Sequence, residues 1–264
     1  MSETAEAPPE ERESMPAMGF LDHLEELRKR LVYCIIAVVV GFFACWGYRE
    51  QIYGIMQKPI MDALRANGMS DKLVYLNPTE PFNLYLKVSA LAGLFLTSPF
   101  VLYQVWMFIS PGLYRNEKRY VVPFMISTIA LFAAGGYFGY SLVYPAALNF
   151  LIGFSKQFTP MITIGEYTSL FLSIILGMGL IFEMPILVFF LALMGIVSAG
   201  FMWKNFRYSI LVIFIIAAIV TPTTDIMNMC IFAAPMVALY AVSIGVAWLV
   251  HPKQRKARRE KQAR

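Results

Sequence analysis

The sequence predicts an all-α integral membrane protein with six transmembrane helices, kinked and cupped, and with both termini in the cytoplasm. Hydrophobic residues make up 58% of the 264 residues, charged residues make up 15%, and the mean hydropathy is +0.61. A soluble domain is typically about half apolar and a quarter charged. The apolar residues form long runs, and the basic residues gather in the connections between them. These observations place the protein in the class of helical integral membrane proteins.

The first segment, residues 1–19, is acidic and contains prolines. It lacks the basic start and apolar stretch of a cleavable signal peptide, and its composition is typical of a disordered tail. Residues 20–30, FLDHLEELRKR, then predict an amphipathic entry helix. In it Glu26 precedes Arg30 by four residues, the favourable order for an acid and a base on one helix face.

Five long apolar runs follow, and a helix needs about 20 apolar residues to cross a hydrocarbon core of about 30 Å. The runs cover approximately Leu31–Tyr48, Val88–Leu113, Tyr120–Ser155, Tyr167–Trp203 and Tyr208–Val250. The third is longer than one span needs, and Pro145 is expected to end its helix. The last is too long for one helix, and the turn TPTTD at 221–225 divides it, which makes six helices. The fifth helix, Tyr208–Val220, is short, about 20 Å at about 1.5 Å per residue.

Prolines are expected to interrupt or bend several of these helices, because each one removes a backbone hydrogen bond. The extracytoplasmic segment 49–82 is expected to form short helical pieces that are broken at Pro59, Gly68, Pro78 and Pro81. Intramembrane bends are expected at Pro99, Pro185 and Pro235. Repeated bends favour a curved assembly over a straight bundle.

The distribution of lysine and arginine predicts the orientation, since cytoplasmic connections carry the excess of basic residues. Basic residues precede the first span, lie between spans 2 and 3 and between spans 4 and 5, and fill the tail 251–264. All of these basic segments lie on one side of the membrane only if the number of spans is even, and both termini are then cytoplasmic. Residues 20–250 therefore form one six-helix transmembrane domain, followed by a basic cytoplasmic tail. The net charge of +5 reflects this face and does not indicate nucleic-acid binding.

One carboxylate, Glu183, lies in the apolar stretch GMGLIFEMPILVFFLAL, two residues before Pro185. An acid at mid-helix depth costs about 2.5–3.5 kcal/mol on insertion scales and usually faces a bundle interior or a wet cavity. Glu183 is therefore a candidate functional residue. The alternative is a protonated structural acid that is hydrogen-bonded to a neighbouring helix.

A second candidate site is the loop FISPGLYRNEKRY, residues 108–120, in which Glu117 lies among basic residues. The plainer interpretation is a charge-balanced surface turn. The functional one is a carboxylate that pairs with a guanidinium of a partner, a strong and directional contact. The entry segment adds Glu25 and Glu26 at the same cytoplasmic face of the protein. Two acidic sites there would suit a ligand with two adjacent arginines.

Nothing in the sequence indicates an enzyme. The two histidines, His23 and His251, lie at opposite ends of the chain, and no GxxxxGK[ST] nucleotide-binding loop occurs. The three cysteines lie inside apolar spans without metal-ligand spacing. We therefore expect no catalytic residue, no metal and no cofactor.

Four motifs together resemble the TatC family of the twin-arginine protein translocase. They are HLEELRKRL at 23–31, YQVWMFISPGLYRNEKRY at 103–120, GLIFEMP at 179–185 and TPTTD at 221–225. The resemblance covers about residues 20–250 and excludes the two charged tails.

This resemblance implies a core subunit of the twin-arginine translocase in the bacterial cytoplasmic (inner) membrane. Such a subunit binds the twin-arginine signal peptides of folded precursors. With the single-span partners TatA and TatB it mediates export driven by the proton-motive force. More than one copy is expected in the receptor complex, surrounded by membrane lipid.

The resemblance also implies roles for individual residues. Signal-peptide contacts are expected at Glu26, Arg28, Phe108, Glu117 and Glu183. Partner docking is expected at Thr221, Asp225 and Asn228. Asn228 enters this set because Met229 occupies a position where the family often has glutamine.

Two other functions fit parts of the sequence. A proton-coupled secondary transporter would use Glu183 as a proton relay, although no intramembrane base and no internal repeat accompany it. A structural scaffold would explain the helices but not the acidic groups at the cytoplasmic face.

Overall fold

A computed structural model describes residues 20–68, 73–109, 121–154, 161–193, 195–220 and 226–262. Within these ranges the chain consists of helices, turns and short connections, with one isolated parallel bridge between Val74 and Thr163. The acidic segment 1–19 lies outside them. The all-α class predicted from the sequence is therefore confirmed.

The entry segment and the first span form one uninterrupted helix, α1 (Phe20–Trp46). Many of its large apolar side chains are exposed, among them Ile36, Val40 and Phe43. A helix that exposes such residues on the surface of the chain needs an apolar solvent, which the lipid bilayer provides.

Helix α2 (Arg49–Ala66) corrects the expectation that Pro59 breaks this segment, because Pro59 lies inside the helix. A proline leaves the carbonyl four residues earlier without its helical donor. Here that carbonyl belongs to Ile55, and the hydroxyl of Tyr140 donates to it at 2.8 Å. The helix ends after Ala66, where Gly68 adopts a positive φ of 67°.

Helix α3 (Glu80–Ile109) contains Pro99 and also stays continuous. The carbonyl freed by this proline is that of Phe95, and the hydroxyl of Ser98 donates to it at 2.8 Å. Pro81 does not break a helix but lies in the first turn of α3, right after Glu80, where a missing N–H is harmless.

The third span is longer than expected. Helix α4 (Val121–Phe138) continues through a π-helical turn, η3 (Gly139–Val143), into α5 (Tyr144–Phe154). Pro145 therefore does not end the helix, as the sequence suggested. The π turn just before it moves the bonding by one residue, so that the N–H of Tyr144 reaches the carbonyl of Gly139.

The fourth span consists of α6 (Ile164–Phe182) and α7 (Met184–Leu193), which meet at Glu183. The predicted bend at Pro185 is therefore a break between two helices. A short helix α8 (Ala199–Lys204) leads to α9 (Phe206–Val220). The last helix, α10 (Ile226–Gln262), contains Pro235 and runs past its apolar span.

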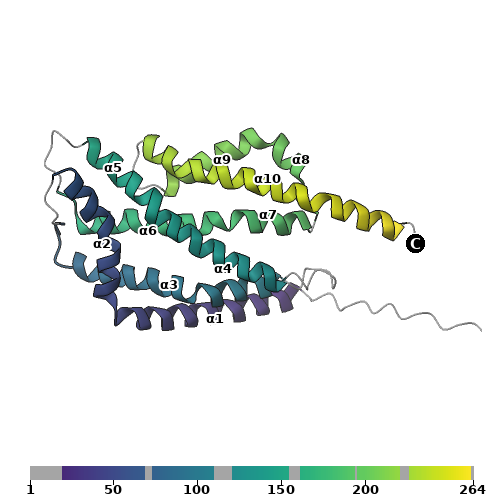
Figure 1. Cartoon of the computed structure of the whole chain (residues 1–264). Coiled ribbons are helices and arrows are strands. Elements are labelled where there is room, and N and C mark those ends of the chain that lie inside the picture. Colours follow the sequence, from purple (N-terminus) through teal and green to yellow (C-terminus); the bar gives the residue numbers. More distant parts are fainter. Residues whose placement is uncertain are drawn as a thin grey trace, which may run out of the picture.

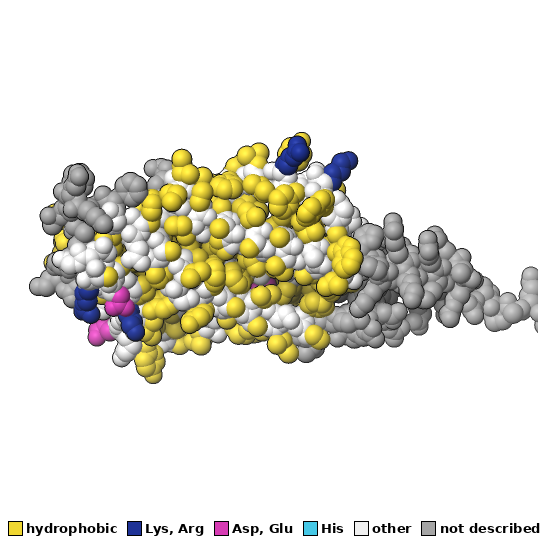
Figure 2. All heavy atoms as spheres, turned by 45° about the horizontal axis from the view of Figure 1, so that its top comes forward, with side chains coloured by type: hydrophobic (Ala, Val, Ile, Leu, Met, Phe, Trp, Pro, Cys, Tyr) yellow, Lys and Arg dark blue, Asp and Glu magenta, His cyan; other side chains and the backbone are white. Residues whose placement is uncertain are grey.

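Among the described residues, five helical stretches are long and apolar enough to cross a membrane, and α9 is a shorter apolar helix. Together they make the six predicted helices. Successive spans run in opposite directions, and α1 begins at the end of the molecule where α10 finishes (Figure 1). We call this the Phe20 end, and the opposite end, which α2 covers, the α2 end. Hydrophobic side chains cover most of the face in Figure 2, with Lys, Arg, Asp and Glu mainly toward the two ends.

Candidate functional site

The first site lies where α1 and α3 pack together near the Phe20 end. These two helices make the most extensive contact in the described chain. The imidazole of His23 stacks on the ring of Phe108, with ring centroids 4.4 Å apart and planes inclined by 17°. We call the facing residues His23, Glu26, Arg30, Gln104 and Phe108 the α1–α3 seam.

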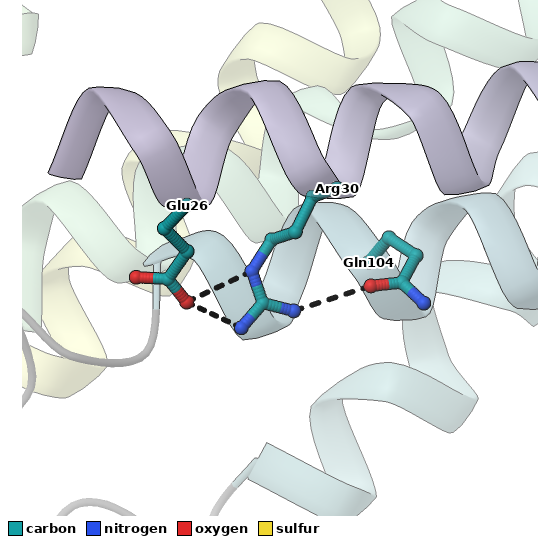
Figure 3. Close-up of polar contacts among 3 residues, drawn as sticks. All are labelled: Glu26, Arg30 and Gln104. Atoms are coloured by element: carbon teal, nitrogen blue, oxygen red, sulfur yellow. Dashed lines mark hydrogen bonds and ion pairs between the residues drawn. The ribbon is translucent and has the colours of Figure 1, made fainter. Parts of the chain in front are cut away.

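In the seam, Glu26 is held by Arg30, which is held in turn by Gln104 (Figure 3). The Nε of Arg30 donates to Oε1 of Glu26 at 2.9 Å, and one terminal nitrogen of the guanidinium reaches the same oxygen. The other terminal nitrogen donates to the amide oxygen of Gln104 at 3.2 Å. The pair predicted from the four-residue spacing is therefore formed, and it is extended to a second helix.

Only one oxygen of the Glu26 carboxylate is used in this way. The other, Oε2, is buried and accepts no hydrogen bond from any residue that the structure describes. The side chains of Glu26 and Arg30 are 18% and 19% exposed. The seam thus holds a carboxylate oxygen that is shielded from solvent and for which the described residues supply no donor.

The structure brings together only some of the residues expected to contact a signal peptide. Glu26 and Phe108 lie in the same seam. Arg28 is exposed and belongs to another face of α1, because residues two positions apart on a helix do not face each other. Glu117 lies outside the described residues.

The second site is a cavity of about 540 Å³ beside Glu183, which we call the Glu183 cavity. Its wall comes from α3, α4, α6 and α7 and is mostly leucine, valine and phenylalanine. Glu183 is partly buried at the junction of α6 and α7. Its Oε1 is buried and accepts no hydrogen bond from the described part of the chain. The cavity can therefore take an apolar segment and offer it one carboxyl group.

The wall of the Glu183 cavity is fixed by a tryptophan. The indole N–H of Trp106 on α3 donates to the hydroxyl of Thr128 on α4 at 3.0 Å. The indole also packs on the ring of Phe190 on α7, with centroids 4.1 Å apart. Three helices around Glu183 are therefore linked through one side chain. Helix α3 contributes to both sites, because Gln104 contacts Arg30 on α1 and its neighbour Val105 lines the cavity.

The third expected site, for partner subunits, is only partly visible. Thr221 and Asp225 lie outside the described residues. Asn228, on the first turn of α10, is buried, with 3% of its surface exposed. No group of three or more His, Cys, Asp or Glu side chains that could hold a metal ion occurs within the described ranges.

Sequence reasoning missed the residues that support these sites. Gln104 is a single amide in the apolar and aromatic stretch 99–109, Thr128 follows Ser127 in another apolar stretch, and both Gln104 and Thr128 are buried in the structure. His23, for which the sequence offered no role in a site, is exposed and stacks on Phe108. A polar residue in an apolar helix is a signal that could have singled out Gln104, though not its partner Arg30.

Comparison with known proteins agrees with this architecture. The profile of the family described as "Sec-independent protein translocase protein (TatC)" matches residues 22–235. The Sec-independent protein translocase protein TatC of Koribacter versatilis is 68% identical over 251 residues, which cover 95% of this chain and 93% of that protein. The TatC protein of Carboxydothermus hydrogenoformans is 37% identical over 90% of this chain and 96% of its own length.

A solved structure has the same fold. The crystal structure of the twin-arginine translocase receptor TatC superimposes with a TM-score of 0.78 at 34% sequence identity, and the match covers 86% of this chain and 99% of that one. The family profile, the relatives and the solved structure point to the same non-enzymatic membrane component of a protein translocase. The chain therefore belongs to the TatC family of Sec-independent protein translocase proteins.

Proposed function

We propose that this TatC protein is the receptor subunit that binds the twin-arginine signal peptides of folded precursors. With TatA- and TatB-type partners, it mediates their export driven by the proton-motive force. Family membership supports the translocase role. The observation that carries the receptor role is Oε2 of Glu26, which is buried in the α1–α3 seam and receives no hydrogen bond from the described residues.

The arginine pair is recognised at the Phe20 end by carboxylates. Glu26 accepts one guanidinium, and Glu117, in the connection between α3 and α4, accepts the other. Charge-assisted hydrogen bonds of this kind contribute about 1.5–3 kcal/mol each. Phe108 supplies an aromatic face beside Glu26, and the exposed Arg28 contacts acidic or backbone groups of the signal peptide.

The apolar part of the signal peptide occupies the Glu183 cavity. The cavity lies on the face of α3 that adjoins Gln104, since Val101 and Val105 line it, so that a peptide held at the α1–α3 seam can continue around α3 into it. Glu183 then offers a hydrogen-bonding group at membrane depth. The Glu183 cavity, with one carboxyl group in a mostly apolar wall, therefore suits a peptide segment whose side chains are apolar and whose terminal backbone groups can hydrogen-bond to Glu183.

Partner subunits dock along α9 and the turn that follows it. This helix has 15 residues, about 22 Å, and is shorter than the hydrocarbon core. The polar groups of Thr221 and Asp225 then come next to the membrane interior, where a single-span helix of TatA or TatB type can satisfy them. Asn228 supports the site from its buried position at the start of α10.

The protein acts in the bacterial inner membrane with both termini in the cytoplasm. Helix α1 begins and α10 finishes at the same end of the molecule (Figure 1). The basic residues of the tail 251–264 belong to the end of the chain, and an excess of lysine and arginine marks the cytoplasmic side of a membrane protein.

Photo-crosslinking from position 108 tests the receptor role. Membranes with the full chain and its partner subunits receive a precursor with an arginine pair, or the same precursor with a lysine pair. We expect an adduct that depends on the arginines. No adduct, or an equal adduct with both precursors, would contradict the receptor role, and solute flux dependent on Glu183 would then support the transporter alternative.

A further inference from the structure

The pairing of Glu26 with Arg30 is one-sided. Arginine and carboxylate often meet as two forks, with two parallel hydrogen bonds to two oxygens. Here Nε and one terminal nitrogen of Arg30 both contact Oε1, and Oε2 accepts nothing from the described residues. Leaving a buried oxygen unpaired is costly. The arrangement is therefore better suited to accepting a second guanidinium than to stabilising α1 alone.

Gln104 is the residue that can keep the pairing one-sided. Its amide oxygen accepts from the terminal nitrogen of Arg30 that points away from Glu26. Gln104 is itself buried, with 8% of its surface exposed, so its amide is anchored on α3. A free arginine side chain has many rotamers, but a guanidinium held on both edges has one orientation. Arg30 is thus fixed against α3, and Glu26 is fixed against Arg30.

We propose that Gln104 and Arg30 are positioning residues that make the signal-peptide site select arginine over lysine, an inference that rests on the proposed receptor function. We call the hydrogen-bonded series from Gln104 through Arg30 to Glu26 the relay. Because the relay fixes its orientation, Glu26 offers one buried oxygen in one direction. A guanidinium is planar and weakly hydrated, so it can donate there at low cost. An ammonium is compact and strongly hydrated, so it loses more on entering a site without water.

Without the relay, Glu26 is free to turn toward water. A mobile, hydrated carboxylate attracts both cations through charge alone, since the geometry no longer distinguishes them. The relay therefore affects the ratio of the two affinities. A purely structural link between α1 and α3 would instead change both affinities by the same factor.

The test measures the affinities of an arginine-pair peptide and a lysine-pair peptide, each followed by the same apolar segment. Both compete with a fluorescent arginine-pair peptide for membranes that contain the full chain and its partner subunits. Gln104→Leu removes the acceptor at similar volume, and Gln104→Glu retains an acceptor oxygen. Ser89→Ala is the matched control, because it removes a buried hydroxyl from α3 about 22 Å further along the helix.

We expect Gln104→Leu to lower the preference for arginine at least about threefold, a modest share of one charge-assisted hydrogen bond. Gln104→Glu should restore the preference, and Ser89→Ala should leave it unchanged. Arg30→Lys, which cannot hold Glu26 and Gln104 with one planar group, should also lower it. This variant carries the test if Gln104→Leu yields no folded protein.

A preference that stays at the wild-type value in the folded Gln104→Leu and Arg30→Lys proteins would overturn the inference. So would equal losses of affinity for both peptides. Failure of the receptor function gives a different result, because the wild-type chain would then not prefer the arginine-pair peptide at all.

Discussion

At the scale of single residues, the two acids of the candidate sites differ in how they are supported. Glu26 is paired through one oxygen, whereas Glu183 has a buried oxygen without a donor among the described residues. An acid inside an apolar bundle costs about 2.5–3.5 kcal/mol. Within the described ranges no residue of a neighbouring helix donates a hydrogen bond to the buried Oε1 of Glu183 to offset this cost. The interpretation of Glu183 as a structural acid therefore lacks the contact that it requires, and a role toward a partner or signal peptide is favoured.

Replacing Glu183 tests this role. Glu183→Gln keeps the volume of the side chain and its capacity to hydrogen-bond. Because one hydrogen bond then replaces another, export in a cell-based assay should stay within about threefold of wild type. Glu183→Leu removes the polar group, and export should fall about tenfold or more. The same two changes at Glu166, an exposed acid in the first turn of α6, serve as controls. Equal export by wild type and both Glu183 variants would exclude a role for this carboxyl.

The sequence was sufficient to find these acids but not what surrounds them. Glu183 stands out as a charge in an apolar stretch, and Glu26 stands out through its four-residue spacing to Arg30 and through the HLEELRKRL motif. Gln104 and Thr128 depend on which residue of another helix lies opposite, and helix spacing in one sequence does not contain this information. The distances of 3.2 Å to Arg30 and 3.0 Å to Trp106 follow from packing between helices.

At the scale of helices, a proline does not by itself decide whether a helix breaks, since Pro59, Pro99 and Pro235 all lie inside continuous helices. The carbonyls freed by Pro59 and Pro99 accept hydrogen bonds from Tyr140 on another helix and from Ser98 on the same helix. Next to Pro185 the helix instead ends at Phe182. The sequence shows where a hydrogen bond is missing, but it does not show whether another side chain replaces it. That is why the number of spans was predicted correctly and the breaks only in part.

The close contact of α1 with α3 depends on two glycines. A Cβ on Gly93 would lie 2.6 Å from the nitrogen of Phe42 and 2.8 Å from the carbonyl carbon of Gly41. Both atoms belong to the backbone, so only a separation of the helices relieves the clash. Small residues at such crossings let helices in membranes approach each other. The same contact holds the α1–α3 seam together, so the position of Glu26 beside Gln104 depends on it.

Gly93→Ala should therefore destabilise the protein by about 1–3 kcal/mol, the usual cost of overpacking. A lower melting temperature in detergent and a weaker preference for an arginine-pair peptide are expected together. Gly245→Ala on α10 is the control, because a Cβ there meets no atom within 4 Å. Unchanged thermal stability of Gly93→Ala would contradict the close packing of the two helices.

At the scale of the whole molecule, the proposed recognition and docking sites lie at opposite ends. Glu117 belongs to the connection between α3 and α4, which joins helices at the Phe20 end. Asp225 belongs to the connection between α9 and α10, which joins helices at the α2 end. A helix of 30 residues such as α3 is about 45 Å long. Electrostatic interactions in water are screened within about 8–10 Å, so charge at one end has little direct effect at the other.

Losing one carboxylate should therefore affect one step and spare the other. Glu117→Ala should weaken precursor binding about tenfold, since it removes a charge-assisted hydrogen bond to an arginine. Asp225→Ala should leave precursor binding within about twofold, because surface changes remote from a site cost little, and it should reduce the amount of partner subunit that copurifies. Pull-down of precursor and of partner subunits from the same membranes measures both effects. If Asp225→Ala lowered precursor binding more than Glu117→Ala did, recognition would depend on the α2 end, and the assignment of the two sites would have to be exchanged.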